Sequence, residues 1–311
     1  MIYTITLNPC LDRHLEVEEL KFDDANRIQA ESRYAAGKGV DVSVVITELG
    51  GNSIALGFVG GYAGLELEGM LVNRGVNCDF VQIGEDTRTN IHILNRKTGK
   101  QTSLNAKGPH IKAVELGIFC KKIRDLVPKP SFVSMNGSIP QGITPSIYKQ
   151  LSLWLKAQGA RIVLDADGEA FREGLKAEPF LVKPNLHELG RYFEVDLKNA
   201  ALSELADYCQ KLNQAGVEVV VLSIGQRGLL VTQGRLGLHI VVPKVEVRST
   251  IGSGDSVIAG MLFQLSNGST LEEAARWGAA CGTATAMTTG TQLCRRQDVL
   301  DLLPKIKVKT L

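Results

Sequence analysis

The chain has 311 residues and a formal net charge of +2, with 44% hydrophobic and 22% charged residues. This length can bury one large core with a smaller appended element, and the composition is that of an ordinary globular protein. No block of lysine and arginine is present, so neither nucleic acid nor an anionic membrane is indicated as a partner. We therefore expect small-molecule chemistry.

The cysteines and the first residues indicate the compartment. Six cysteines are scattered without a C-x-x-C pair, which favours buried thiols in a reducing cytosol over a disulfide or zinc framework. The start, MIYTITLNP, has no basic segment and enters a strand pattern at once, and no apolar run reaches membrane-spanning length. We expect a cytoplasmic protein.

The first third of the chain predicts a strand, a small sheet and a helix. Residues 2–7 alternate as a strand that stops at Asn8-Pro9, with Asp12 in the following loop. Residues 15–20 and 27–34 predict short strands with polar faces, typical of a lid or edge sheet. Gly37-Lys38-Gly39 then opens a helix over 40–49. A lysine between glycines at a helix start fits a phosphate contact, and a solvated surface turn is an equal alternative.

The next segment adds a second pair of lid strands. Residues 54–59 predict a buried strand and 65–72 a helix, while 91–94 and 101–104 flank a turn and predict a hairpin. We therefore expect a small β-lid built from about 15–34 and 91–105. Arg88 precedes the hairpin, and its planar guanidinium suits phosphate, although a lone arginine here is usually a surface residue.

From about residue 113 the pattern alternates between helix and buried strand. Strands are predicted over 132–135, 162–164, 180–182 and 217–222, and helices over 114–126, 145–155, 168–175, 186–193 and 202–212. Strands that are apolar on both faces call for a mostly parallel sheet covered by helices on both sides. No linker or repeat divides the chain, so we expect a single α/β domain over residues 1–311.

Polar residues follow several of these strands. In parallel sheets, ligands bind beyond the carboxyl ends of the strands. The polar or glycine-rich strand ends are Asn136 to Ser138, Asp165, Lys183 to Asn185, Ser223 to Gly225, and the turn at Gly252. Together they predict a cleft at one edge of the sheet.

The stretch RSTIGSGDSVIA, residues 248–259, is the centre of this prediction. It joins a strand-like run over 240–247 to a helix-like run over 257–265 through Gly252, Ser253, Gly254 and Asp255. Two glycines and a helix N-terminus make an anion site, where a carboxylate repels a phosphate unless it is needed to take a proton from an attacking hydroxyl. Asp255 as a simple N-cap is the alternative.

Other common motifs are absent, and one pair points to a metal. The sequence contains no P-loop, no G-x-G-x-x-G after the first strand, no H-E-x-x-H and no G-x-S-x-G. Asn185 and Glu188, three residues apart at a helix start, share a face and can hold Mg²⁺ directly or through water. A reciprocal capping box is the alternative for this pair.

The motifs in this order resemble those of the PfkB (ribokinase-like) family of carbohydrate kinases. RSTIGSGDSVIAGM is similar to the C-terminal signature, AGKGVDVS to the N-terminal glycine signature, and KPNLHEL to the magnesium motif. The likeness continues through TLNPCLD, GFVGG, DTRTNIHI, NGSIPQG and LSIGQRG. Within the family the chain resembles the branch acting on phosphorylated hexoses, above all 1-phosphofructokinases, and then tagatose-6-phosphate kinases and minor 6-phosphofructokinases.

The resemblance implies a ribokinase-like α/β sandwich with a β-lid that serves as a homodimer clasp, and an ATP- and Mg²⁺-dependent kinase. By resemblance, Asp255 is the base, and Gly252, Ser253 and Gly254 form the anion hole. Asn185 and Glu188 organise Mg²⁺. The implied sugar-phosphate residues are Asp12, Gly37, Lys38, Gly39, Asp41, Arg88 and Ser138. The implied nucleotide residues are Lys183, Asn185, Ser223, Gly225, Gly228 and Gly254.

Three residues depart from the family pattern: Ala36 stands for a glycine, Asp41 for an asparagine, and Arg227 for an acidic or small polar residue. Asp41 bears on which sugar is preferred, because a carboxylate only accepts hydrogen bonds. The expected reaction is phosphorylation of fructose 1-phosphate to the 1,6-bisphosphate. A sugar-phosphate or nucleotide sensor without catalysis is the rival, and Asp255 argues against it.

Overall fold

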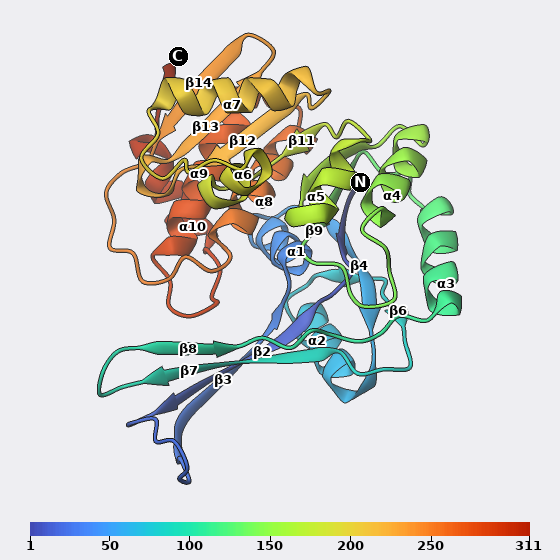
Figure 1. The fold of residues 1–311 in the computed structure, drawn as a ribbon, viewed down its shortest axis with the longest axis vertical. Coiled ribbons are helices and arrows are strands. Elements are labelled where there is room, and N and C mark those ends of the chain that lie inside the picture. Colours follow the sequence, from blue (N-terminus) through green and yellow to red (C-terminus); the bar gives the residue numbers. More distant parts are fainter.

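The computed structural model describes all residues 1–311 and contains one large and one small β-sheet (Figure 1). The large sheet has eleven strands: β1 (Ile2–Thr6), β4 (Ser53–Val59), β5 (Asn77–Cys78), β6 (Val81–Gln82), β9 (Phe132–Asn136), β10 (Arg161–Asp165), β11 (Leu181–Val182), β12 (Val219–Ser223), β13 (Leu229–Gln233), β14 (Leu236–Val241) and β15 (Lys307–Thr310). Its order is β15-β14-β13-β12-β11-β10-β9-β1-β4-β5, with β6 also pairing with β4.

The strands from β5 to β12 run parallel, as predicted, whereas β13, β14 and β15 form an antiparallel edge. The predicted strand over 240–247 is partly wrong. Strand β14 ends at Val241, and residues 242–250 adopt neither helix nor strand. The strand pairs only as far as Val241, which lies opposite Lys307 of β15. The antiparallel edge was not predicted.

Ten helices connect the strands: α1 (Lys38–Glu48), α2 (Gly61–Asn73), α3 (Ala113–Arg124), α4 (Ile147–Ala157), α5 (Gly168–Leu175), α6 (Leu186–Phe193), α7 (Leu202–Gln214), α8 (Ser253–Ser266), α9 (Leu271–Ala286) and α10 (Arg296–Leu302). Short 3₁₀ turns lie at Gly225–Arg227 and Leu303–Lys305. Each helix predicted from periodicity is present, with ends shifted by a few residues. No helix is long and apolar enough to cross a membrane.

Two hydrophobic cores lie on opposite faces of the large sheet. In β10, Ile162 and Leu164 belong to a core of 36 buried residues, whereas Val163 between them belongs to a core of 29. This alternation follows from the two-residue period of a strand, and it explains why the strand sequences are apolar throughout. The three-layer α/β sandwich is therefore the predicted one.

The small sheet has four strands, β2 (Cys10–Val17), β3 (Ile28–Ala36), β7 (Arg88–Asn95) and β8 (Gln101–Leu104), in the order β3-β2-β7-β8. It projects from one end of the sandwich (Figure 1). Asp12 lies within β2, opposite Tyr34 of β3 and Asn90 of β7, and not in a loop as predicted. The strand starts earlier because it has a partner on each side from Cys10 onward.

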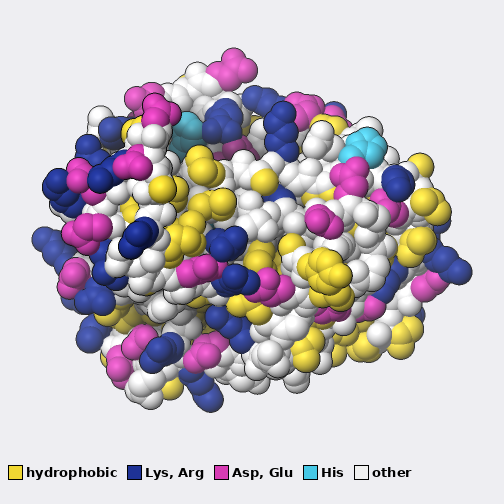
Figure 2. Space-filling model, turned by 90° about the horizontal axis from the view of Figure 1, so that it is seen from below, with side chains coloured by type: hydrophobic (Ala, Val, Ile, Leu, Met, Phe, Trp, Pro, Cys, Tyr) yellow, Lys and Arg dark blue, Asp and Glu magenta, His cyan; other side chains and the backbone are white.

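The charged surface and the state of the cysteines are as the composition leads one to expect. On the face seen in Figure 2, lysine and arginine side chains are interspersed with aspartate and glutamate side chains. All six cysteines are free thiols; four are buried and Cys78 and Cys120 are half-buried.

Candidate active site

Helix α8 begins in the turn predicted to bind an anion. Gly252 is its N-cap with φ 73°, a left-handed conformation that favours glycine, and a β-carbon there would lie 2.6 Å from Leu293. No side chain caps the helix, and the backbone N–H groups of Gly254 and Asp255 have no hydrogen-bond acceptor. Free N–H groups at the positive end of a 14-residue helix provide a site for an anion.

Asp255 is buried in the first turn of this helix, with 7% of its surface exposed. Burial and the neighbouring negative charge of Asp165 raise the pKa of Asp255 to about 7, against the opposing effect of Lys38 and Lys183. A carboxyl group with a pKa near neutrality is suited to accept a proton at physiological pH.

Asp165, at the carboxyl end of β10, is the centre of an ion-pair cluster. Its Oδ1 lies 3.1 Å from Lys38 Nζ and 3.8 Å from Lys183 Nζ. Lys38 also lies 3.6 Å from Glu188 Oε1. Burial would lower the pKa of Lys38, but the charges of Asp165, Asp255 and Glu188 outweigh it and hold that pKa above its usual value. Lys38 therefore carries a positive charge close to Asp255.

Buried polar atoms without partners gather at the same sheet edge. They include both amide atoms of Asn136, Asp165 Oδ2, Ser223 Oγ and Ser253 Oγ. An unsatisfied buried polar group costs about 1–3 kcal/mol, so their convergence at strand ends and the α8 N-terminus fits a site that binds a polar ligand.

Asn185 and Glu188 form the capping box that the sequence left open as an alternative. Asn185 Oδ1 accepts the Glu188 N–H at 2.9 Å, and Glu188 Oε2 accepts the Asn185 N–H at 2.9 Å. The second carboxylate oxygen, Oε1, faces Lys38. The pair therefore caps α6 and still presents one oxygen toward the ion-pair cluster.

Asp41 in the first turn of α1 and Asp12 in β2 add two carboxyl groups near Asp255. Burial and the charges of Asp255 and Asp12 raise the pKa of Asp41 well above its usual value. A β-carbon on Gly39 would lie 2.5 Å from Thr6 Oγ1 and 3.3 Å from Asn136 Oδ1, so only glycine lets α1 start this close to β1 and β9. The three carboxylates of Asp12, Asp41 and Asp255 thus face one region.

Arg88 and Ser138 meet at Asn8. The Arg88 guanidinium donates to the Asn8 carbonyl at 2.8 and 3.2 Å and to the Ala106 carbonyl at 3.0 Å. The Asn8 side chain donates to Ser138 Oγ at 3.2 Å. The structure therefore places Arg88 and Ser138 together at the base of the small sheet, with carbonyl oxygens as the partners of the guanidinium.

The remaining predicted residues lie near β12. Gly225 and Gly228 have φ values of 62° and 93°, and a β-carbon on Gly228 would lie 2.0 Å from the Ile240 carbonyl. Arg227 turns away from the strand ends, since its Nη1 donates to the Ala200 carbonyl at 2.9 Å. Ala36, the third departure, is buried at the end of β3.

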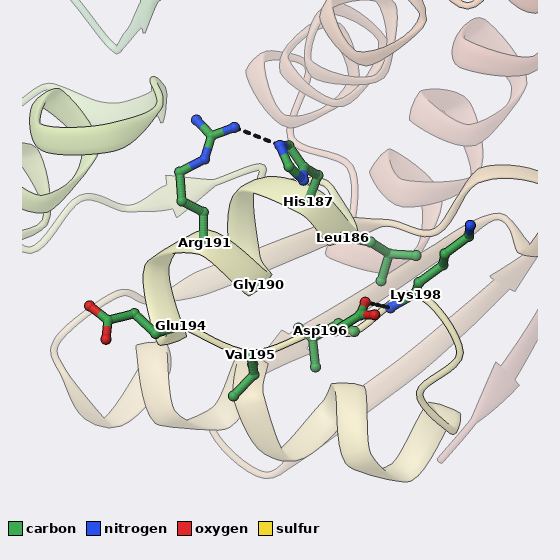
Figure 3. Close-up of a pocket in the computed structure, with 9 residues that line it drawn as sticks. Leu186, His187, Gly190, Arg191, Glu194, Val195, Asp196 and Lys198 are labelled. Carbon is green, nitrogen blue, oxygen red and sulfur yellow. Dashed lines mark hydrogen bonds between the residues drawn. The ribbon is translucent and has the colours of Figure 1, made fainter.

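A surface pocket of about 640 Å³ lies at α6 and the residues that follow it (Figure 3). It is lined by Leu186, His187, Gly190, Arg191, Glu194, Val195, Asp196, Leu197 and Lys198, none of which was predicted as a site residue. The Arg191 guanidinium is held by His187, at 2.6 Å, and by Asp167. Its lining includes none of the residues described around Asp255.

The sequence predicts Asn136 and Asp165 at the edge of the cleft but assigns neither a chemical role, and it assigns none to Asn8. The sequence feature that could have indicated such a role is their position, because Asp165 and Asn136 are each the last residue of a buried strand. Their contacts join segments more than 100 residues apart, such as Lys38 and Asp165, and no sequence pattern shows these pairings.

Comparisons with known proteins show the family and the fold of the chain. Residues 4–298 match the model of the pfkB family carbohydrate kinases. Two 1-phosphofructokinases are each 36% identical: that of Borreliella burgdorferi over 99% of this chain and 98% of its own, and that of Bacillus subtilis over the full length of both. The structure of phosphofructokinase-2 from Escherichia coli in complex with potassium superposes with a TM-score of 0.92 at 28% identity, covering 98% of each chain.

The fold is therefore the expected ribokinase-like α/β sandwich with a small additional sheet. The family model covers almost the whole chain, and the relatives exceed 30% identity over their full length. The chain belongs to the pfkB family of carbohydrate kinases, enzymes that transfer a phosphoryl group from ATP.

Proposed function

We propose that this protein transfers the γ-phosphoryl group of ATP to a free hydroxyl of a ketohexose phosphate, converting fructose 1-phosphate to fructose 1,6-bisphosphate. The observation that carries the proposal is Asp255, a buried carboxyl group with a pKa of about 7 in the first turn of a helix where the N–H groups of Gly254 and Asp255 are free. The names of the full-length curated relatives support the substrate.

In this proposal, Asp255 accepts the proton of the acceptor hydroxyl as that oxygen attacks phosphorus. The N–H groups of Gly252, Ser253 and Gly254 stabilise charge on the transferred group, as preorganised donors do in phosphoryl transfer. Lys38 and Lys183 both pair with Asp165, and from there their positive charge acts on the Asp255 carboxylate. The chain acts as one kinase domain over residues 1–311, with the small sheet as its lid.

The donor set fits ATP with Mg²⁺. Mg²⁺ prefers oxygen ligands and keeps several waters. Glu188 Oε1 is the oxygen of the Asn185–Glu188 pair left outside the capping box, and Asp165 Oδ2 is buried without a partner. Asn185 and Glu188 would hold the ion mainly through water, and the ion would neutralise phosphate charge. Lys183, Ser223, Gly225, Gly228 and Gly254 would border the nucleotide.

The sugar phosphate would be bound by two groups of residues. Its hydroxyls would be surrounded by Asp12, Asp41, Gly37 and Gly39, and its phosphate would be approached by Lys38, Arg88 and Ser138.

The test of the proposed function is turnover by purified protein with ATP, Mg²⁺ and fructose 1-phosphate, fructose 6-phosphate or tagatose 6-phosphate. We expect the highest kcat/KM with fructose 1-phosphate. No turnover on any of them, together with calorimetric binding of a non-hydrolysable ATP analogue, would instead identify a sensor.

Arg88→Ala is expected to raise KM for fructose 1-phosphate about 10- to 100-fold with a smaller change in kcat, since a charged hydrogen bond contributes about 1.5–3 kcal/mol. Arg13→Ala is the control, because Arg13 pairs with Glu31 within the small sheet. Steady-state kinetics of both variants make the comparison. An unchanged KM in Arg88→Ala removes Arg88 from the site.

We further propose that the small sheet is the contact between two copies of the chain. This sheet and its connections expose three large apolar side chains: Phe22 is 87%, Ile28 50% and Leu104 54% exposed. Exposing apolar groups to water is unfavourable, so these side chains favour a contact with another protein surface. Ile28→Glu is expected to shift a dimer toward monomer in sedimentation velocity. Leu236→Glu, on β14 next to the edge strand β15 of the large sheet, should leave the mass unchanged. A wild-type monomer contradicts the proposal.

A further inference from the structure

One face of the small sheet carries a group of metal-ligand side chains. Strands β2 and β7 run parallel, with His14 opposite His92 and Asp12 opposite Asn90. Residues two apart on a strand share a face, so Asp12, His14 and His92 point to the same side of the sheet. One ligand atom from each of the three lies within 4.8 Å of the others.

The hydrogen bonds around these side chains leave one atom of each unpaired. Asp12 Oδ1 accepts from Asn90 Nδ2 at 2.9 Å and from Cys10 Sγ at 3.3 Å. Its other oxygen, Oδ2, lies 3.5 Å from His92 Nε2, a buried nitrogen without any hydrogen bond. A buried ring nitrogen left unpaired beside a carboxylate oxygen is costly unless a proton or a cation lies between them.

Both imidazole rings are held by hydroxyl groups through their other nitrogen. His92 Nδ1 shares a hydrogen bond with Ser103 Oγ at 2.8 Å, and His14 Nε2 shares one with Thr291 Oγ1 at 3.2 Å. Metal-binding histidines in proteins are oriented in this way, with the nitrogen that does not bind the metal in a hydrogen bond. The arrangement leaves His92 Nε2, His14 Nδ1 and Asp12 Oδ2 as ligand atoms.

We propose that Asp12, His14 and His92 bind a divalent first-row transition-metal ion, with zinc preferred, and that a water completes the tetrahedron. Two imidazoles and a carboxylate are ligands for zinc, copper or nickel rather than for Mg²⁺ or Ca²⁺. The 3.5 Å between Asp12 Oδ2 and His92 Nε2 matches the roughly 3.4 Å between ligands that are each about 2.0–2.1 Å from zinc.

Binding requires one adjustment. The rings of His14 and His92 are stacked, with centroids 4.6 Å apart and planes at 25°. The His14 ring must leave this stack and approach by roughly 1 Å to reach ligand distance. Thr291, its hydroxyl partner, lies in the segment between α9 and α10, so binding also links the small sheet to that segment.

The site has a consequence for catalysis. Asp12 Oδ2 is the oxygen that a sugar hydroxyl would use, because Oδ1 already accepts two hydrogen bonds. The metal ion and the sugar should therefore compete. This consequence, unlike the metal site itself, rests on the proposed role of Asp12 in sugar binding.

The experiment is calorimetric titration of chelator-treated, full-length protein with ZnCl₂, repeated with CoCl₂ to record the visible absorption of tetrahedral Co²⁺. The variants are His92→Ala, His14→Ala, Ser103→Ala and, as the control, His110→Ala, a residue that is exposed, belongs to no strand of the small sheet and has its ring next to Gly142. Ser103 is exposed, so Ser103→Ala removes the hydrogen bond to His92 and leaves the fold intact.

Wild type and His110→Ala are expected to bind one ion per chain with a tetrahedral Co²⁺ spectrum. Affinity should fall at least about 10-fold in Ser103→Ala and further in the two histidine variants. Equal affinity in all variants, or no binding by wild type, overturns the proposed metal site.

Fructose 1-phosphate should lower the affinity of wild type for zinc. If it does not while kinase turnover is intact, the proposed competition is wrong and the kinase proposal stands.

Discussion

Asp255→Asn is expected to lower kcat by about 10²- to 10⁴-fold, the usual contribution of a positioned general base. The amide has the shape of the carboxyl group but cannot accept the proton of an attacking hydroxyl at neutral pH. Nucleotide binding should persist, because the free N–H groups of the α8 N-terminus are backbone groups and remain in place. Single-turnover kinetics and calorimetry with a non-hydrolysable ATP analogue measure the two effects separately.

The melting temperature of Asp255→Asn shows whether a loss of activity is a catalytic defect or a folding defect. The pKa of folded Asp255 is about 7, above its unfolded value of 3.8, so the folded state binds its proton more tightly. The stability that this group contributes is therefore full below about pH 3.8 and is lost as pH rises from there to about 7, and above pH 7 the charged carboxylate destabilises the fold. At pH 8, Asp255→Asn should melt no lower than wild type. A Tm at least equal to wild type with full activity would exclude Asp255 as the base.

Asp165→Asn is expected to move the acidic limb of the kcat/KM profile from about pH 7 to a value at least one unit lower. Asp165 raises the pKa of Asp255 through its negative charge, and removing it leaves Lys38 and Lys183 to stabilise the Asp255 carboxylate. A nearby charge shifts a pKa by about 1–3 units. The measurement is kcat/KM against pH from 5 to 9.

The same substitution should lower the free energy of unfolding by about 3 kcal/mol, since it removes the ion-pair partner of the buried Lys183 and the nearer of the two partners of Lys38. Asp167→Asn is the matched control, because Asp167 pairs with Arg191 at the surface and lies two residues beyond Asp165. Asp167→Asn should change neither the acidic limb of the kcat/KM profile nor the free energy of unfolding appreciably. An acidic limb that stays in place, or moves to higher pH, in Asp165→Asn contradicts the electrostatic account.

The sheet edge that carries the candidate site could be predicted from the sequence because parallel strands end at a common edge. Asn136, Asp165, Lys183 and Ser223 follow strands whose apolar character is unmistakable, and the fold brings these ends together as predicted. The glycine turn before α8 was also recognisable, because the positive φ of Gly252 leaves little choice of residue.

Other features depend on tertiary contacts that local sequence does not record. The strand containing Asp12 extends through it because β3 and β7 both pair with β2, and the cross-chain pairs of Asp165 with two lysines depend on the finished sheet. The antiparallel strands β13 and β14 are joined by only Gly234 and Arg235, and this hairpin was not predicted. The capping box at Asn185 shows that one pair of residues can satisfy a structural pattern and a ligand pattern together. A cytoplasmic location stays a prediction.

The most direct measurement is a crystal structure with fructose 1-phosphate and a non-hydrolysable ATP analogue bound. The account predicts an acceptor hydroxyl about 2.6–3.2 Å from an Asp255 carboxylate oxygen, with the γ-phosphate facing the N–H groups that start α8. A sugar phosphate bound with every hydroxyl beyond hydrogen-bonding reach of Asp255, while the γ-phosphate occupies the α8 turn, would contradict it.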